Sequence, residues 1–168
     1  FIAKQGMMFS STADSHGECD ASFRAGEAGF VLVLDDKHIL YPEYQGNGVM
    51  ASMGNIFENP NIGLLFIDFF ETKVGLHVNG KASIIKNENL EKSLEEFDGG
   101  YEILNTHKDK FKIVSYTLVE VDEAYIHCSS YIPILENVDT KITSKKFSNN
   151  SKGGDAFGVE KKQREWID

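Results

Sequence analysis

The sequence predicts a mainly β protein (α+β), a β-barrel of six or seven short antiparallel strands with short flanking helices. Three observations lead to this fold class. Apolar or alternating runs of strand length recur along the chain, polar turns separate them, and only two stretches carry the period of a helix. A βαβ array would instead require helices that alternate regularly with parallel strands.

The first part of the chain predicts a helix end and two strands. Residues 1–5 are expected to end a helix, and residues 7–13 to form a strand that stops at the polar turn of residues 14–17. A second strand is expected to begin near Cys19.

A hairpin and a short helix follow. Residues 29–34 and 38–42 are β-rich runs on either side of the polar residues 35–37, which predicts an antiparallel hairpin. The pattern then becomes helical. Apolar residues fall at i, i+4, i+7 and i+8, on one face of an amphipathic helix that Asn59-Pro60 ends: Val49, Met53, Ile56 and Phe57.

Two further runs have the character of central strands. Residues 62–70 form a continuous apolar run of strand length, and residues 75–85 form another. The second run contains Gly80, which is expected to mark a bulge or a bend.

The last predicted elements are a helix and two strands. Asn89 is positioned to cap a helix that residues 98–100 stop and that carries Leu90, Leu94 and Phe97. Residues 110–122 alternate as in a long strand with one buried face, and residues 124–128 suggest a further short strand. Residues 1–137 are therefore expected to form one domain. Residues 138–168 are polar with almost no apolar period, and they are expected to be disordered or to pack on a partner.

Composition limits the partners. The 168 residues include 17 Lys and Arg against 26 Asp and Glu, which gives a net charge of −9. Nucleic acid and anionic membranes are not expected as partners, because both need a basic face. Because the chain is acidic, any phosphate that the protein binds must be held by local groups.

No apolar run approaches the roughly 20 residues of a membrane helix.

Cys19 and Cys128 form no CxxC pair, so the sequence predicts neither a disulfide framework nor a thiolate zinc cluster. A reducing cytoplasm is the expected location. The chain starts at Phe1 and not at Met, so a preceding signal peptide stays open.

The stretch of residues 41–52, YPEYQGNGVMAS, has the outline of an anion site. Gly46 and Gly48 can adopt positive φ and turn successive N–H groups inward, and the helix that follows adds a partial positive charge at its N-terminus. A phosphate can bind there without Lys or Arg. The alternative is a plain loop between a strand and a helix.

The same glycines also satisfy a dinucleotide-binding fingerprint, Gly46-x-Gly48-x-x-Ala51, with Asp68 about 20 residues further on. Two features argue against a Rossmann fold. Residues 42–45 separate the glycines from the preceding strand, and strand pairs follow where helices and parallel strands should alternate.

Other candidate chemistries are weaker. HExxH, GxSxG and GxxxxGK[ST] motifs are absent. His127 and Cys128 are adjacent, so in a strand they face opposite sides and no metal site is predicted. Separate carboxylates are expected on the solvated surface: Glu43, Asp68 and Glu120. Arg24, the only arginine before Arg164, is either a surface residue or a ligand contact.

Four blocks taken together resemble a known family. They are residues 19–24 (CDASFR) followed by 29–31, residues 41–50, residues 59–60 running into 63–66, and residues 76–82 (LHVNGKA). They resemble the pyridoxamine 5'-phosphate oxidase-like, FMN-binding split-barrel family, in particular a bacterial subgroup of uncharacterised flavin-binding proteins. The similarity covers about residues 1–135, and residues 124–133 resemble the closing strand of that subgroup.

The resemblance implies a homodimer with FMN in a groove between two protomers, contacted by both. It places Ser22, Phe23 and Arg24 on the strand beside the flavin ring. Tyr41 and Pro42 would lie beside the ribityl chain.

The same resemblance implies a phosphate site made of main-chain N–H groups and the Ser52 hydroxyl. Its members are Asn47, Gly48, Val49, Met50 and Ser52. His127 and Ser129 are candidates for contacts from the second chain.

Pyridoxamine phosphate oxidases carry an Arg-Lys pair in the phosphate turn and a C-terminal Arg and His that grip the substrate. This chain has Gly48-Val49-Met50 in the turn, which argues against pyridoxal phosphate synthesis. Subgroup relatives tend to have a basic residue where this chain has Ser130.

The resemblance therefore implies an FMN-dependent oxidoreductase with an unknown small-molecule substrate or electron donor, in which the flavin supplies the chemistry and no general base is required. Two alternatives stay open: a flavin-binding or carrier protein without turnover, and a haem-binding relative on the same barrel.

Overall fold

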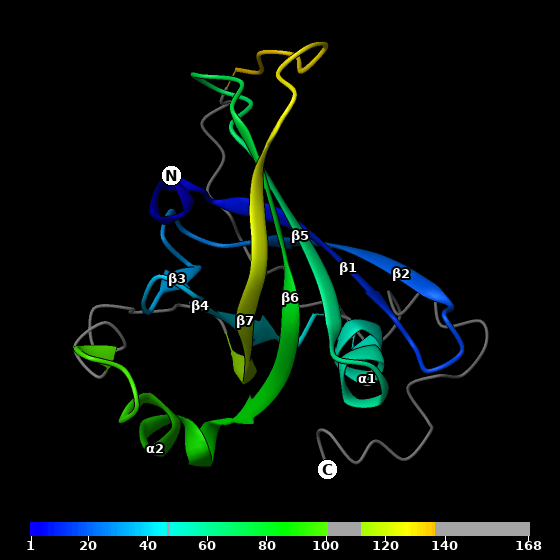
Figure 1. Ribbon diagram of the computed structural model, residues 1–168, viewed down its shortest axis with the longest axis vertical. Coiled ribbons are helices and arrows are strands. Elements are labelled where there is room, and N and C mark those ends of the chain that lie inside the picture. The colour runs from blue at the N-terminus through cyan, green and yellow to red at the C-terminus, as the bar shows by residue number, and fades with distance from the viewer. Residues whose placement is uncertain (47, 101–111, 137–168) are drawn as a thin grey trace.

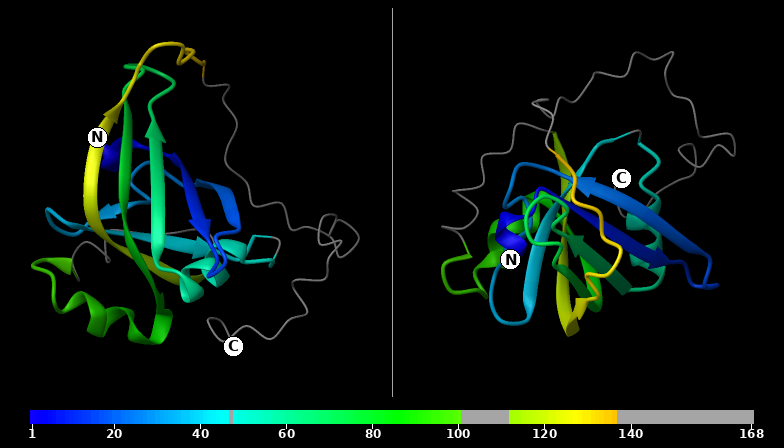
Figure 2. Two further views of the ribbon diagram at one scale, coloured as in Figure 1. Left: turned by 45° about the vertical axis from the view of Figure 1, so that its right-hand side comes forward. Right: turned by 90° about the horizontal axis from the view of Figure 1, so that it is seen from above.

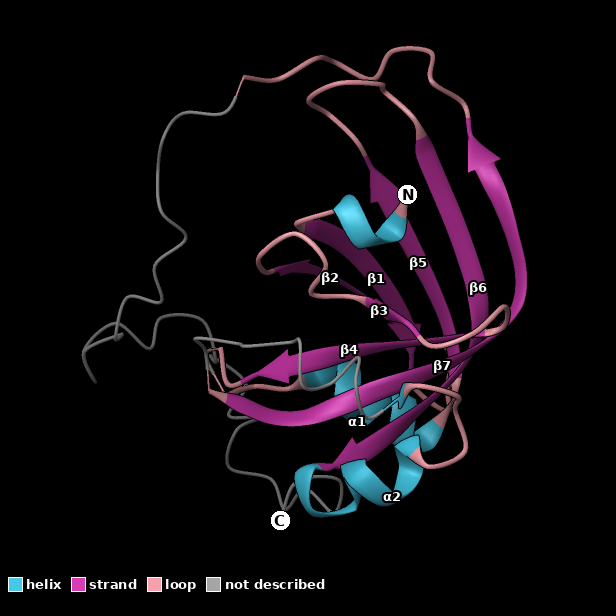
Figure 3. Cartoon of the chain, turned by 90° about the vertical axis from the view of Figure 1, so that its left-hand side faces the viewer, coloured by secondary structure: helices cyan, strands magenta, loops and turns pink. Residues whose placement is uncertain are grey.

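The computed structural model describes residues 1–46, 48–100 and 112–136, whose strands form one seven-stranded antiparallel sheet. Its order is β2-β1-β5-β6-β7-β4-β3. The sheet curls strongly in Figures 1 and 3, and β2 and β3 are its two edge strands. The predicted mainly β split barrel is confirmed. Its elements are the 3-10 turn Ile2–Lys4, β1 Met7–Ala13, β2 Cys19–Ala25, β3 Leu32–Val33, β4 His38–Tyr44, α1 Ala51–Glu58, β5 Asn61–Ile67, β6 Gly75–Lys86, the 3-10 turn Asn87–Asn89, α2 Leu90–Leu94 and β7 Ile113–His127.

The final strand is longer than predicted. The sequence indicated two strands near residues 110–122 and 124–128, but β7 runs unbroken through this region and pairs with β6 along its length. One extra residue, Asp122, lies where the register shifts between Asn79 and Gly80. A Cβ on Gly80 would stand 2.1 Å from the carbonyl oxygen of Glu120. The strand therefore absorbs its polar residues as a bulge, and glycine permits the close approach predicted at position 80.

Smaller differences concern the ends of elements. Only Leu32–Val33 of the predicted run 29–34 is a strand, and it pairs with β4 as expected. β5 ends at Ile67 because the Asp68 carboxylate accepts hydrogen bonds from the turn N–H groups of Phe70, Glu71 and Thr72. Asn89 precedes α2 but makes no side-chain cap. The predicted arm, residues 138–168, lies outside the described residues.

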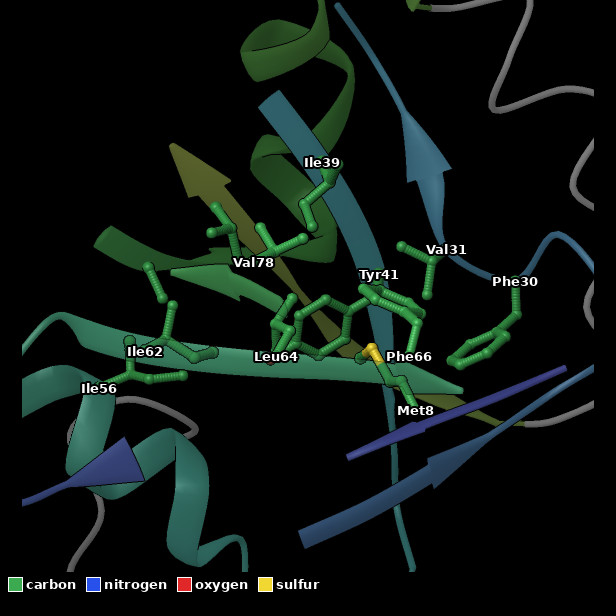
Figure 4. Close-up of a cluster of buried hydrophobic side chains, with 12 residues drawn as sticks. Met8, Phe30, Val31, Ile39, Tyr41, Ile56, Ile62, Leu64, Phe66 and Val78 are labelled. Carbon is green, nitrogen blue, oxygen red and sulfur yellow. The ribbon is translucent and has the colours of Figure 1, made fainter. Parts of the chain in front are cut away.

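Two apolar clusters form the core. The larger one fills the barrel and combines side chains from β1, the segment before β3, β4, α1, β5, β6 and β7, and ten of its residues are labelled in Figure 4. The smaller one lies between β4, β6, β7 and α2. The views in Figure 2 show α1 near the turn that joins β1 to β2, and hydrogen bonds connect the two, from Ser15 to Glu58 and from Asn59 to Asp14. Within the described residues no helix is long and apolar enough to cross a membrane.

Candidate functional site

The glycine-containing turn before α1 has the predicted backbone conformation. Gly46, Gly48 and Met50 have φ values of 49°, 86° and 55°. No heavy atom lies within 4 Å of a Cβ built on Gly48, so this side of the turn is open. α1 begins at Ala51, two residues later than Val49, which therefore belongs to the turn. The structure thus presents a turn with left-handed residues at positions 46, 48 and 50 that leads into a helix N-terminus. Asn47 lies outside the described residues.

Ser52, in the first turn of α1, joins this helix to β2. Its hydroxyl lies 3.0 Å from the Ser22 hydroxyl and 3.3 Å from the Asp20 carboxylate, to which Ser22 also donates at 2.9 Å. Ser52 is 2% exposed. Two of the predicted site residues are therefore in direct contact. The Asp20 carboxylate, which the sequence did not indicate, lies beside them.

Arg24 projects from the same face of β2 as Ser22, and it pairs with Glu43 at the end of β4. Its Nη2 lies 3.1 Å from Glu43 Oε2 and 3.3 Å from Oε1, and Thr117 donates to Oε1 at 3.1 Å. Glu43 is only 2% exposed, so the expectation of a solvated carboxylate was wrong. Burial raises the pKa of Glu43, while Arg24 and Thr117 oppose the rise.

Tyr41 and Pro42 precede Glu43 on β4 and are fully buried. The Tyr41 ring points into the barrel core beside Phe66 (Figure 4), and burial raises its pKa, with repulsion from Glu43 as the second cause. These residues therefore support the end of β4 from within. Contact with a ribityl chain stays a prediction, and within this chain neither residue offers accessible surface.

Phe23 lies on the opposite, outer face of β2 and is 56% exposed. Its ring packs on Phe9 of β1 with centroids 5.6 Å apart. The strand registers continue this pair into one row across the outer face of five strands, here called the outer row: Phe23, Phe9, Leu65, His77 and Tyr125. The ring of His77 stacks on that of Tyr125 at 4.6 Å.

His127 and Ser129 lie at the far end of β7. His127 pairs with Gly75, and its Nδ1 lies 2.8 Å from Nε2 of His77. Thr117, which is opposite Tyr41, is ten residues earlier on β7, which at about 3.3 Å per residue is roughly 33 Å along the strand. Among the described residues, the contacts of His127 are with Gly75 and His77 and not with the cluster around Ser52 and Arg24.

Other chemically able groups lie apart from this cluster. Asp14, His16 and Glu58 have ligand atoms within 4.8 Å of one another. Two of these side chains are exposed, and the Asp14 and Glu58 oxygens already accept hydrogen bonds from the turn at residues 15–18. Cys128 is exposed, and hydrogen bonds from Ser130 lower its pKa.

Sequence reasoning missed two members of the cluster, Asp20 and Glu43. Asp20 alternates with two predicted residues along β2 and shares a face with Ser22 and Arg24. That spacing could have indicated Asp20. Glu43 follows Pro42 directly, and only the tertiary fold shows that its side chain is buried.

The site residues thus come from β2, the end of β4 and the start of α1, on a split antiparallel barrel. A family model described as Pyridoxamine 5'-phosphate oxidase matches residues 1–127. The chain belongs to the pyridoxamine 5'-phosphate oxidase family. A search of curated protein sequences finds no significant match.

Solved structures agree with the family's fold. HupZ of Group A Streptococcus is 17% identical with a TM-score of 0.51, covering 74% of this chain and 87% of its own. Atu2129 of Agrobacterium tumefaciens, a protein of unknown function, is 10% identical with a TM-score of 0.50, covering 75% and 52%. An FMN-binding protein of Syntrophomonas wolfei is 14% identical with a TM-score of 0.49, covering 75% and 77%. At these identities the likeness concerns the fold alone.

Proposed function

We propose that this member of the pyridoxamine 5'-phosphate oxidase family binds FMN and acts as a flavin-dependent oxidoreductase on a small molecule. The observation that carries the proposal is the convergence of three segments. The polar face of β2, the end of β4 and the open turn at Gly48 meet around Ser22, Ser52 and Arg24. The sequence blocks that resemble the family's flavin site are therefore adjacent in the folded chain.

Three features of the site fit a phosphate, and one carboxylate opposes it. The open side of Gly48 leaves room for an anion beside main-chain N–H groups, and the N-terminus of the eight-residue helix α1 favours negative charge. Arg24 Nε is a buried donor without a partner among the described residues, and an acceptor on a ligand would relieve it. The Asp20 carboxylate acts in the opposite direction, because it repels an anion near Ser52.

When bound, the flavin would supply hydride or electron transfer. The chain's own contribution is to bind and orient. Val49 and Met50 would hold the phosphate through the main chain, and Gly48, whose own N–H donates to the Gln45 carbonyl at 3.0 Å, would let it approach. Ser22 and Arg24 would lie beside the ring.

Phe23 requires a separate place in the proposal. It points to the outer face of β2, away from Ser22 and Arg24. Its ring would therefore reach a flavin only at the contact with a second copy of the chain.

A homodimer is part of the proposal. The outer row exposes aromatic surface, with Phe9 40%, Phe23 56% and Tyr125 48% exposed, which is typical of a face that a partner covers. His127 lies ten strand residues, roughly 33 Å along β7, from the position opposite Tyr41, and Ser129 lies beyond the end of the strand. A second copy would bring these residues to the flavin, and the groove would be complete only in the dimer.

The test is the absorption spectrum of protein reconstituted with FMN. A flavin spectrum that NAD(P)H bleaches supports an oxidoreductase. A bound flavin that nicotinamides do not bleach would leave a carrier. No retention of flavin, with a Soret band on addition of haem, would replace FMN by haem and overturn the proposal.

A further inference from the structure

The barrel is open between β2 and β4. β2 is the first strand of the sheet and pairs only with β1, whereas β4 lies at the other end between β7 and β3. Among the described residues no main-chain hydrogen bond of a strand ladder joins β2 to β4. Figure 3 shows the two strands on separate parts of the curled sheet. Among the described residues, the direct connections from β2 to β4 and α1 are therefore made by side chains.

Within residues 1–46, 48–100 and 112–136, two side-chain contacts cross the opening. One is the hydrogen-bonded set of Ser22, Asp20 and Ser52, which ties β2 to α1. The other is the Arg24–Glu43 pair, which ties β2 to β4. The second is better buried, since the Arg24 side chain is 18% exposed and that of Glu43 is 3% exposed.

Glu43 has hydrogen-bond partners on two other strands. Nη2 of Arg24 reaches both oxygens of Glu43, and Thr117 on β7 donates to one of them. Thr117 is itself fully buried in the strand paired with β4. Glu43 therefore has partners on β2 and β7 at once, and removing Arg24 leaves a buried carboxylate with a single neutral donor. Such a loss is more costly than the loss of an exposed ion pair.

We infer that Glu43 is a positioning residue that holds Arg24, and through it β2, against β4 across the split of the barrel. The part of this inference that concerns ligand binding rests on the proposed function, because Ser22 and Arg24 then reach a flavin only while the pair is intact. The mechanical part concerns β2 alone.

Hydrogen exchange followed by mass spectrometry separates the two parts. The variants are Arg24→Met, Glu43→Leu and the double variant, each compared with Glu120→Gln, which neutralises an exposed carboxylate on β7. Amides of β2 should exchange at least about tenfold faster in each single variant, since breaking a buried pair on one side leaves the other group buried without its partner and favours local opening. Amides of β5 and β6 should change little.

In the double variant, the acceleration of β2 amide exchange should be smaller than the product of the two single-variant accelerations, because both substitutions remove the same interaction. Acceleration spread evenly over β2, β5 and β6, or single variants indistinguishable from Glu120→Gln, would overturn the inference. Multiplicative effects in the double variant would do so as well.

FMN titration of the same proteins tests the ligand part. The dissociation constant should rise about tenfold or more in Arg24→Met and Glu43→Leu and stay unchanged in Glu120→Gln. If the unmodified protein does not bind FMN, the proposed function fails while the exchange data still decide the role of Glu43. If FMN binds and its affinity is unchanged when β2 is loosened, the ligand part is wrong and the mechanical part stands.

Discussion

The two faces of β2 differ in what they contact. On the inner face, Asp20, Ser22 and Arg24 are each hydrogen-bonded to a side chain of β2, α1 or β4. On the outer face, Phe23 contacts Phe9 and is otherwise open to solvent. One strand thus carries polar contacts that close its own barrel and an apolar surface that nothing in the described part of the chain covers. This difference suggests that the inner face organises a ligand site and the outer face a contact between copies.

The largest effect is expected where the inner-face site meets the open turn. Gly48→Val should raise the FMN dissociation constant about a hundredfold or more. Valine at a φ of 86° costs about 1 to 3 kcal/mol of backbone strain and puts a side chain where the phosphate would lie. Fluorescence titration with FMN measures the loss.

Gly17→Val is a matched control for that substitution. Gly17 has a φ of 84° and, like Gly48, no heavy atom within 4 Å of a built Cβ, but it lies in the turn between β1 and β2. It should cost similar stability and leave FMN affinity unchanged. Equal losses of affinity in the two variants would show that strain, and not the phosphate site, accounts for the effect.

On the outer face, Phe9→Glu should dissociate the proposed dimer. A carboxylate at position 9, within the outer row, would be buried without a partner in the dimer contact. The dimer dissociation constant should therefore rise about thirtyfold or more. Light scattering should find about twice 18.8 kDa for the unmodified protein and about 18.8 kDa for the variant. Val33→Glu, at a 46% exposed position on β3, is the control. An unmodified protein that is monomeric at micromolar concentration contradicts the dimer.

A smaller effect of opposite sign is expected at Asp20. Asp20→Asn keeps an acceptor for Ser22 and removes the negative charge near Ser52, so FMN affinity should increase about three- to tenfold. Riboflavin, which has no phosphate, should bind this variant and the unmodified protein alike. An equal gain for both flavins would place the Asp20 charge away from the phosphate.

The smallest expected effect is the pH dependence of stability through Glu43. Because burial raises its pKa above 4.5, the folded protein holds the proton more tightly than the unfolded chain does. The resulting stability is complete below the ordinary carboxyl pKa and is lost as the pH rises through the raised value. Arg24 and Tyr41 are the charged and titratable groups that act on it.

Glu43→Gln cannot titrate at this position. The free energy of unfolding of the unmodified protein, relative to this variant, should therefore fall as the pH rises through the raised pKa of Glu43. Urea denaturation at each pH measures it. A relative stability that grows with pH would mean that the ion pair outweighs burial and lowers the pKa.

Much of the fold followed from local sequence pattern. β1 has its predicted limits, and the register irregularity at Gly80 was indicated by a glycine inside a strand pattern. The division of β7 into two strands was wrong because its polar residues after Val121 suggested a turn, whereas only one edge of the strand is paired there and the other faces solvent. Period alone does not reveal such an edge.

The site was less predictable than the fold. Glycines that need positive φ mark a turn within a few residues of sequence, so Gly46 and Gly48 were identifiable. The left-handed conformation of Met50 was not, because the start of α1 imposes it. The burial of Glu43 depends on Arg24 and Thr117, which are 19 and 74 residues away, and no local pattern encodes that meeting.

The account depends on a phosphate held at the turn before α1, and comparison of FMN with riboflavin tests this most directly. Both flavins present the same ring and ribityl chain, so any difference in affinity reports the phosphate. Main-chain hydrogen bonds to a charged group contribute about 1.5 to 3 kcal/mol each, and FMN should therefore bind the unmodified protein at least about tenfold more tightly than riboflavin. Equal affinities of the two flavins in a fluorescence titration would contradict the assignment.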